Sequence, residues 1–552
     1  MRFRSKCRGS LLVLGVGLAV TPACKSQQST QEQSSAQQAE ELKKQLEELR
    51  KQYEMTTYQL GQRIASLEAQ LDKQGGTHPP QQASGKTKQE GTVSIGQIAQ
   101  QAAQQAVDSA LVGGTGQVGS QYQGRVAAEP TYDQLSEAEQ KIAKLQEDAR
   151  AFEFHGYFRS GYGLNSEGGQ QVAFQAPGAD AKYRLGNEAE TYGEFIFVDN
   201  WLNPRRSGDK AWMKSEVMIE ANTSNAATYA NFPGNNGNDQ FRLRESFVQA
   251  GNLIGFQPDA KFWAGNRYYH RYHIEINDFY PLDMSGYGGG VEDWNLRIGK
   301  ISVAYLSGAR PDIVTQNGNY AKSNIDVRLY NIKGPAGFFG VWFDYADAKG
   351  GTTPEGTVIP TTDGWAVGLR HQKLEWHGGY EAFSVQYGKG AASTFNTSLD
   401  DPSPFLKHSE KLLIAEHLLI QPNSKFAIMP IFIFQRKRDG IPGHGFTDWA
   451  SFGARPEIFF NRYISLAFEG GFDHTEGFAV TQNGNTNFDG WLRKITIAPQ
   501  LGAGREFFSR PVLRAFLTYA NWSNGFRGLV GGVPFEDRTS GLTYGVQAET
   551  WW

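Results

Sequence analysis

From Phe152 to Trp552, apolar and polar side chains alternate in short segments that are separated by clusters of Gly, Asn, Asp, Ser and Pro. Such alternation predicts β-strands, and no helical periodicity of useful length reappears in this stretch. The stretch also lacks the repeat of about 40 to 50 residues that a β-propeller shows. We therefore predict an all-β region that closes into one large antiparallel barrel.

The length of this region sets the size of the barrel. At about 22 to 25 residues for each strand and its connection, residues 152–552 provide about 16 to 18 strands. A barrel of that size encloses an aqueous channel. A helical membrane protein is excluded, because the one apolar run, Leu11 to Val20, is shorter than the roughly 20 residues that a membrane helix needs.

The two ends of the region show which face of the predicted sheet is polar. In an outer-membrane barrel the apolar face meets lipid, the polar face lines the lumen, and aromatic residues mark the interfaces. In the first strand Phe152, Phe154, Gly156 and Phe158 oppose Glu153, His155, Tyr157 and Arg159. In the last strand Leu542, Tyr544, Val546, Ala548, Thr550 and Trp552 oppose Thr543, Gly545, Gln547, Glu549 and Trp551. The pattern indicates a transmembrane barrel with a wet lumen.

Residues 25–151 differ from the barrel region, because they are rich in Gln, Ala, Ser, Glu and Lys and cannot bury a core of their own. Apolar residues at spacings of 3 and 4 predict about four heptads of coiled coil. These residues are Leu42, Leu46, Leu49, Tyr53, Leu60, Ile64, Leu67 and Leu71. A single solvated helix is the alternative, since Thr56, Thr57 and Gly61 weaken the middle. A second short helix is predicted over 135–150.

The chain begins like an exported protein. Arg2, Arg4, Lys6 and Arg8 precede the apolar run, and Thr21-Pro22-Ala23 follows it. We expect residues 1–24 to be a signal peptide, which would place residues 25–151 in the periplasm. Both cysteines, Cys7 and Cys24, lie in this segment, so the chain beyond it has no disulfide and no thiolate site. Lipidation of Cys24 and ordinary cleavage near Ala23 both stay open.

The overall charge gives no reason to expect a nucleic-acid partner. Lys and Arg number 54 against 57 Asp and Glu, for a formal charge of -3. A nucleic-acid-binding protein would carry a basic surplus.

Five aromatic residues fall on faces that are otherwise polar. A flat ring offers apolar contact to the C–H face of a sugar, while carboxylates and guanidinium groups beside it bind the hydroxyls. The five are Tyr157 (with His155 and Arg159), Tyr192 (with Arg184, Glu188, Glu190 and Glu194), Tyr380 (with Ser384 and Gln386), Phe508 (with Arg510 and Arg514) and Trp551 (with Gln547 and Glu549). We predict a sugar path along the lumen wall.

Two alternatives accompany that prediction. The rings are outward girdle residues if the strands are phased wrongly by one residue, an error that β-bulges make easy. A basic lumen alone would indicate a general or anion-preferring pore. Glu190, Glu194 and Asp278 lie among the arginines, however, and favour recognition of hydroxyl groups.

The sequence lacks the motifs of hydrolases, metalloproteases and nucleotide-binding enzymes. His270 and His273, with Glu275 nearby, have the residue types of metal ligands. In a strand, however, positions 270 and 273 point to opposite faces. We therefore expect no enzyme activity, no metal site and no cofactor.

Several motifs, which recur in order over residues 152–552, closely resemble the maltoporin family. They are Phe154-His155-Gly156-Tyr157-Phe158-Arg159-Ser160-Gly161, Lys182-Tyr183-Arg184-Leu185-Gly186-Asn187-Glu188 with Glu190-Thr191-Tyr192, Trp263-Ala264-Gly265-Asn266-Arg267-Tyr268-Tyr269 with Asp278-Phe279-Tyr280, Ile325-Asp326-Val327-Arg328-Leu329, Ser509-Arg510-Pro511 and the final Trp551-Trp552.

This resemblance implies an 18-stranded outer-membrane porin, a homotrimer that passes maltose and maltooligosaccharides by facilitated diffusion. In that family a helical row of aromatic residues, the greasy slide, guides the glucose rings. The matching positions are Tyr157, Tyr192, Tyr380, Phe508 and Trp551, and a neighbouring subunit adds an aromatic for which Tyr229 or Phe232 is the candidate. The implied polar track comprises Arg159, Arg184, Glu194, Arg244, Arg271 and Asp278, with Tyr280 at the constriction.

The chain departs from the family at three places. Ala173 and Ala189 stand at the positions of an early loop disulfide, so that loop must be fixed by other contacts or move more. Phe508 replaces a tryptophan of the slide. Most loops between 310 and 480 match poorly, and loops set specificity.

The N-terminal extension resembles that of sucrose porins, which carry a periplasmic coiled coil before the barrel, and a three-stranded coil would match a trimer. Three functions therefore stay open. One is a maltooligosaccharide porin. The second is a broader glycoporin, for sucrose or other sugars, or a weakly selective porin. The third is a structural tether between the outer membrane and the cell wall.

Overall fold

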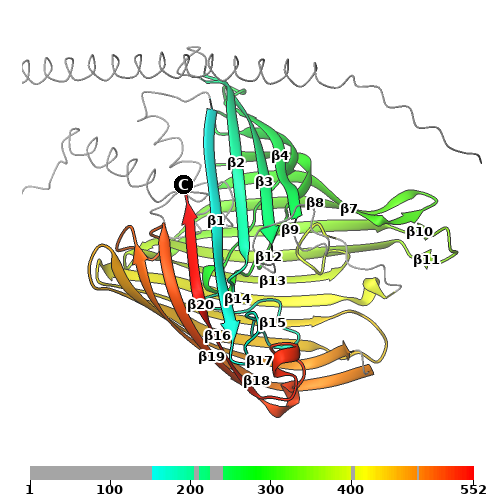
Figure 1. Ribbon diagram of the computed structural model, residues 1–552. Helices are drawn as coiled ribbons and strands as arrows, with labels where there is room; N and C mark the ends of the chain where they lie inside the picture. Colours follow the sequence, from blue (N-terminus) through cyan, green and yellow to red (C-terminus); the bar gives the residue numbers. More distant parts are fainter. Residues whose placement is uncertain (1–151, 204–209, 224–239, 399–404, 482–483) are drawn as a thin grey trace, which may run out of the picture. The chain divides into compact units, whose positions relative to one another are not determined.

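The protein forms a closed antiparallel β-sheet (Figure 1). The computed structural model describes residues 152–203, 210–223, 240–398, 405–481 and 484–552. The main sheet has 18 strands, and β1 (Phe152–Asn165) pairs with β20 (Ser540–Trp551) to close it. The prediction of a large barrel of about 18 strands is confirmed. The predicted signal peptide (1–24) and coiled-coil extension (25–151) lie outside the described residues.

The strands follow one another around the barrel in chain order. The first half contains β1, β2 (Thr191–Leu202), β3 (Trp212–Thr223), β4 (Gln240–Gly251), β5 (Lys261–Arg267), β6 (Gly286–Asn295), β7 (Lys300–Thr315), β8 (Gly318–Gly334) and β9 (Gly337–Lys349). The second half contains β12 (Thr362–Trp376), β13 (Gly379–Gly390), β14 (Glu410–Asn423), β15 (Phe426–Arg438), β16 (Thr447–Phe459), β17 (Ile464–Thr481), β18 (Gly484–Gly502), β19 (Val512–Trp522) and β20.

The remaining elements are short. They are a separate hairpin of β10 (Gly351–Thr352) and β11 (Val358–Ile359) and the 3-10 turns η2 (Glu275–Asn277), η3 (Leu406–His408), η4 (Asn524–Phe526) and η5 (Val533–Phe535). None of the helices in the described part of the chain is long and apolar enough to span a membrane.

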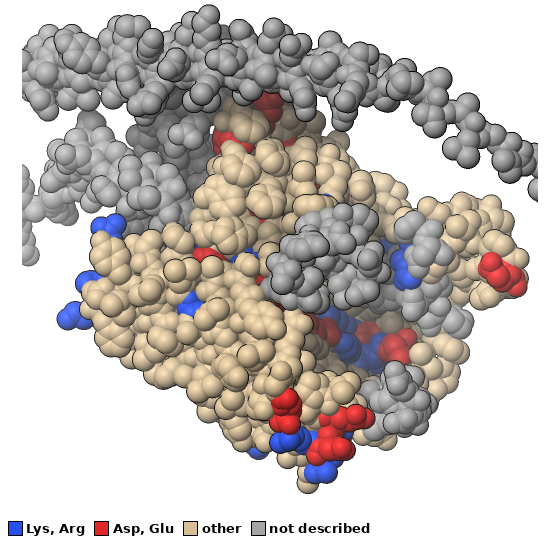
Figure 2. Space-filling view, in the orientation of Figure 1, with Lys and Arg blue, Asp and Glu red and all other residues tan. Residues whose placement is uncertain are grey.

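The two faces of the sheet alternate as predicted. On β1, Tyr157 and Arg159 are buried inside, whereas Phe154 and Phe158 are exposed on the outer face. On β20, Glu549 and Trp551 are buried, whereas Tyr544 and Val546 are exposed. In Figure 2 the visible outer wall is largely uncharged, and acidic and basic side chains lie together within the mouth of the barrel and at its rim. The interpretation that these strands were phased wrongly by one residue is therefore wrong.

Two segments that the sequence placed on strands are loops. Arg184, Glu188 and Glu190 precede β2 and lie in the loop 166–190, where Gly186 takes a left-handed conformation (φ 69°). Phe508 lies in the turn 503–511 between β18 and β19, where Pro511 cannot donate to a sheet. The prediction of five aromatic-bearing strands is corrected to four, with the fifth aromatic in a turn.

The loop of residues 166–190 folds inward and is tied to itself without a disulfide. Ala173 is exposed and Ala189 is buried, at the two positions where the resemblance to maltoporins implies cysteines. Between them, the Asn187 side chain makes two hydrogen bonds to the Phe174 backbone. Its Oδ1 accepts from the Phe174 N–H and its Nδ2 donates to the Phe174 carbonyl, each at 3.0 Å. The same Nδ2 donates to the Tyr183 carbonyl at 2.8 Å.

This loop also reaches the wall formed by β16, β17 and β18. The Tyr183 hydroxyl lies 2.9 Å from Ser451 Oγ. The Leu185 N–H donates to Glu469 at 3.0 Å, and Lys494 Nζ donates to the Leu185 carbonyl at 2.5 Å. The loop is therefore fixed by other contacts, one of the two outcomes that the missing disulfide left open.

The Tyr183 ring fits because β16 and β17 carry glycines beneath it. A Cβ at Gly471 would overlap the Tyr183 ring, and the ring likewise lies against Gly453. Gly470, the preceding residue, has open space around its Cβ position.

We expect Gly471→Ala to lift the loop 166–190 from the wall, because overpacking of this kind costs about 1–3 kcal/mol. Single-channel recording in a planar bilayer should show a larger and noisier ion conductance. Gly470→Ala is the matched control and should conduct like the unaltered protein. Equal conductance of all three proteins would contradict this role for Tyr183.

Candidate functional site

Four of the five predicted aromatic residues form a continuous row on the inner wall. Tyr192 on β2 lies 6.2 Å from Tyr157 on β1, measured between ring centroids. Tyr157 lies 6.3 Å from Trp551 on β20 and is nearly parallel to it, with 25° between the planes. Trp551 lies 6.4 Å from Phe508 in the turn 503–511. The row thus crosses three neighbouring strands and ends in a turn.

The fifth predicted aromatic, Tyr380, lies elsewhere on the inner wall. It is buried on β13, and its ring meets His417 of β14 edge-on at 5.5 Å. Tyr380 shares the inner face with Ser384 and Gln386, as the alternation predicted. Several strands separate β13 from β1 and β20 on either side, because β12 pairs with β9 and β13 with β14.

A single carboxylate, Glu549, joins four side chains beside this row. Its Oε1 accepts from the Tyr157 hydroxyl and from Arg184 Nη2, each at 3.0 Å. Its Oε2 accepts from Arg510 Nη2 at 2.9 Å and from Arg514 Nη2 at 3.0 Å. Glu549 is 1% exposed, so its charge is balanced by arginines rather than by water.

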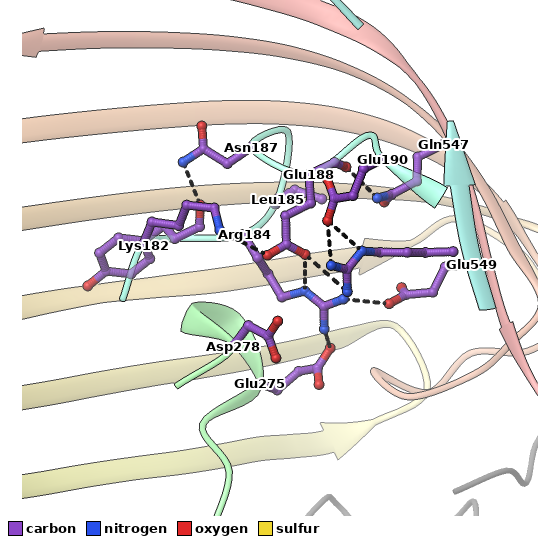
Figure 3. Close-up of polar contacts among 12 residues, drawn as sticks. Lys182, Arg184, Leu185, Asn187, Glu188, Glu190, Glu275, Asp278, Gln547 and Glu549 are labelled. Carbon is purple, nitrogen blue, oxygen red and sulfur yellow. Dashed lines mark hydrogen bonds and ion pairs between the residues drawn. The ribbon is translucent and has the colours of Figure 1, made fainter. Parts of the chain in front are cut away.

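Arg184 connects this carboxylate to two others (Figure 3). Its Nε donates to Glu188 at 3.1 Å and its Nη1 to Glu275 at 2.8 Å. Burial by itself would lower the pKa of Arg184, but the carboxylates of Glu275, Glu549 and Glu188 hold it well above its ordinary value. Arg184 therefore stays charged.

Arg184 also joins the two loops that fold into the barrel. Its backbone N–H donates at 2.9 Å to the carbonyl of Ile276, which belongs to the loop 268–285. Arg159 of β1 pairs with the first of these loops, at 2.5 Å from Glu190 and 3.5 Å from Glu188. The predicted polar residues Arg159 and Arg184 thus lie together beside the row.

The loop 268–285 carries the other predicted polar residues. The guanidinium of Arg271 lies between the rings of Tyr268 and Tyr280, at 4.0 and 3.8 Å from their centroids. Arg271 also pairs with Asp283 at 3.2 Å. Arg271 and Tyr280 are thus brought together by direct contact.

Asp278 stays ionised in this loop. It accepts hydrogen bonds from the Tyr280 hydroxyl at 3.3 Å and lies 3.2 Å from His273 Nε2. Burial would raise the pKa of Asp278, but the His273 hydrogen bond and the charges of Arg184 and Arg159 hold it well below the usual range. A permanent carboxylate in the narrowed lumen can accept hydrogen bonds from a hydroxylated solute.

Glu194 and Arg244, the remaining two predicted polar residues, each contact other partners on the barrel wall. Glu194 accepts from the hydroxyls of Tyr192 at 2.7 Å and Tyr268 at 3.1 Å. Arg244 lies at a bulge of β4 and bonds to Glu220 of β3. These residues hold the wall and the start of the loop 268–285, whereas Arg159 and Arg184 lie at the aromatic row.

The aromatic faces are more covered than a wet lumen implies. Tyr192 is 9% exposed, and Tyr157, Phe508 and Trp551 are 1–3% exposed. Guanidinium groups account for part of this cover, because that of Arg510 lies 4.3 Å from the Trp551 ring and that of Arg159 5.1 Å from the Tyr192 ring.

His270 and His273 do not lie on a strand, which corrects the geometry assumed for them. Both belong to the loop 268–285, and His270 has a positive φ of 43°. Burial, together with Arg328 and Arg267, lowers the pKa of His270 well below its usual value. The described residues contain no group of three or more His, Cys, Asp or Glu placed to hold a metal ion.

The sequence-based selection missed Glu549, Arg510, Arg514, Glu188 and Glu275. Glu549, Arg510, Arg514 and Glu188 had been assigned to the same polar faces as the predicted aromatics, so a signal existed. Glu275 had none beyond its proximity to two histidines. Tyr229 and Phe232, candidates for a neighbouring subunit's aromatic, lie outside the described residues.

Comparison with known proteins gives one family match and several distant structures. The model of the LamB porin family matches residues 152–552. OccAB1 of Acinetobacter baumannii has 9% identity and a TM-score of 0.39 over 73% of this chain and 96% of its own. The anion-selective porin from Comamonas acidovorans has 10% identity and a TM-score of 0.38 over 73% of this chain and 99% of its own. OpdK of Pseudomonas aeruginosa, solved with vanillate, has 9% identity and a TM-score of 0.39 over 73% of this chain and 99% of its own. Similarity at this level carries no argument about function.

Glu549→Gln is expected to shift ion selectivity toward anions, because Arg184, Arg510 and Arg514 lose their shared negative partner. The reversal potential in a salt gradient measures this shift. Loss of a buried partner also costs about 3–5 kcal/mol, so the barrel should unfold at a lower temperature. Glu410→Gln removes the same charge from an outward pair with Arg438 and should leave the selectivity unchanged. An unchanged reversal potential in both variants would refute the role of Glu549.

Proposed function

The chain belongs to the LamB porin family, and on that premise we propose that this outer-membrane porin passes maltose and maltooligosaccharides by facilitated diffusion. The observation that carries the proposal is the row of Tyr192, Tyr157, Trp551 and Phe508. A sugar chain that displaces the side chains covering these rings could move from ring to ring in apolar contact.

The charged groups beside the row support recognition of hydroxyls. Arg159 and Arg184 carry N–H donors that bond to Glu190 and Glu188 here, and Asp278 carries acceptor oxygens beside Tyr280, so a sugar hydroxyl would exchange with these partners. Guanidinium and carboxylate groups make strong hydrogen bonds to neutral polar partners. Mixed charge of both signs favours a neutral, hydroxyl-rich solute over a simple ion.

Trp551→Ala should weaken sugar binding about tenfold while ion conductance is kept or raised, because the ring contact is lost and the lumen widens. Tyr192→Ala should act in the same direction. The measurement is the block of ion current in a planar bilayer during titration with maltose, maltohexaose and sucrose.

The neighbouring Trp552 provides a matched control for Trp551. It faces outward, with its ring 5.5 Å from Phe154 and 6.3 Å from Phe158. Trp552→Ala should therefore bind sugars like the unaltered protein. Block that does not saturate with any sugar would overturn the proposal in favour of a weakly selective porin, and block strongest with sucrose would favour a broader glycoporin.

The outer face of β3 to β6 supports a trimer. Four outward positions on β4 to β6 hold small or polar residues, namely Ser246, Asn266, Ala264 and Gly289, next to the exposed apolar residues Leu243, Val248 and Tyr287. On β15, β16, β18 and β19 the outward face holds the large apolar residues Phe432, Phe452, Ile495 and Leu517. Lipid contact favours the second kind of surface, whereas close packing of another protein surface favours the first. We propose that β3 to β6 contact the neighbouring subunits.

Ala264→Trp should disrupt this contact, because the larger ring has no space in a packed interface. Ala515→Trp places the same ring on the outward face of β19, where lipid accommodates it. Electrophoresis of unheated samples should show loss of the trimer band for Ala264→Trp alone. Trimers of normal stability in both variants would reject this interface.

The N-terminal segment remains part of the proposal. We propose that residues 1–24 are a signal peptide and that residues 25–151 form a periplasmic coiled coil whose three strands would follow the symmetry of the trimer. The basic start and short apolar run of the chain support the signal peptide, and the apolar spacing over 42–71 supports the coiled coil.

A further inference from the structure

Arg510, in the turn 503–511, uses all three nitrogens of its guanidinium group in hydrogen bonds. Its Nε and Nη2 donate to Glu549 at 3.0 and 2.9 Å. Its Nη1 donates to the carbonyls of Phe507 at 3.2 Å and Ser509 at 3.0 Å. The guanidinium is therefore hydrogen-bonded along its edges on both sides, and it is 3% exposed.

The flat face of the same guanidinium packs on the Trp551 ring at 4.3 Å. A planar cation over an indole is a favourable contact, strongest where water is excluded. Because the edges of Arg510 are held by hydrogen bonds, its face is a fixed surface for Trp551.

Arg510 also connects this surface to the next ring of the row. The two carbonyls that it binds belong to the residues on either side of Phe508. Phe508 lies 6.4 Å from Trp551 and 5.0 Å from Phe507. One side chain thus fixes the backbone that carries Phe508 and the face of Trp551.

We propose that Arg510 is a positioning residue that aligns Trp551 and Phe508, the two rings at the end of the row nearest the turn 503–511. This inference rests on the proposed function, and it assigns Arg510 to the binding of long sugars in particular. A disaccharide can use Tyr192 and Tyr157 alone, whereas a longer chain needs all four rings in line. Arg510 thereby controls how much affinity each added glucose unit contributes.

The test compares Arg510→Gln with the unaltered protein in current-block titrations with maltose and maltohexaose. Maltohexaose affinity should fall about tenfold, while maltose affinity changes by about twofold or less. The result is read as the ratio of the two affinities, which a general loss of folded channels does not alter.

Arg505→Gln is the matched control, because it removes the same charge from the same turn. The contact that Arg505 makes with Gln421 uses its backbone carbonyl, at 2.7 Å, and survives the substitution. The affinity ratio should stay unchanged in this variant. An equal fall in both variants would assign the effect to charge and overturn the proposal.

Arg510→Lys keeps the charge beside Glu549 and serves if the glutamine variant does not assemble. A lysine lacks the planar fork, so the affinity ratio should fall as it does with glutamine. A full ratio in the lysine variant would overturn the proposal. Absence of any sugar block in the unaltered protein would refute the proposed function, whereas normal block that Arg510→Gln leaves intact would refute this inference alone.

Discussion

The arrangement of side chains inside the barrel depends on the pairing of β1 with β20. In a bilayer every backbone polar group of a spanning strand needs a protein partner, so the sheet must close. The register of that closure places Tyr157 opposite Trp551 and Arg159 opposite Glu549. The next pairing, of β1 with β2, places Arg159 opposite Tyr192. The contacts that seal the barrel therefore also assemble the aromatic row and the charges beside it.

The loops that narrow the lumen are held by charge and shape rather than by covalent bonds. Asp180 of the loop 166–190 pairs with Lys411 at 3.1 Å and also with Lys437, two inward lysines on neighbouring strands. These pairs add to the contacts that hold the loop, which contains no cysteine. Their strength depends on the exclusion of water, because exposed ion pairs contribute about 0–1 kcal/mol each.

Many charged side chains inside the barrel are nearly inaccessible to water, so each must pair with an opposite charge. Arg455 and Lys494 both bind Glu469, at 2.7 and 2.8 Å, and all three residues are 1–2% exposed. A buried charge without its partner costs several kcal/mol, so each such group constrains its neighbours. This coupling explains how a lumen can be charged and still hold its loops in one arrangement. A solute that enters must meet groups whose positions are already set.

The sequence alone determined the architecture, because alternation with period two follows from strand geometry and needs no tertiary information. It placed Tyr157, Tyr192, Tyr380 and Trp551 on inner faces, which the structure confirms. It failed where the chain leaves a strand. Arg184 and Phe508 lie in segments whose direction is set by contacts with distant strands, so no local pattern could position them.

The tertiary structure also decided which polar residues meet. Glu549 and Glu275 are 274 positions apart in the sequence, and only folding brings both within 3.0 Å of Arg184. Tyr380 shows the opposite case, because its inward face was predictable but its distance from the row was not. The face of the sheet on which a side chain lies follows from its position in a single strand, so the sequence predicts it. Proximity across a closed barrel depends on register and on loops that fold inward, and only the assembled structure sets it.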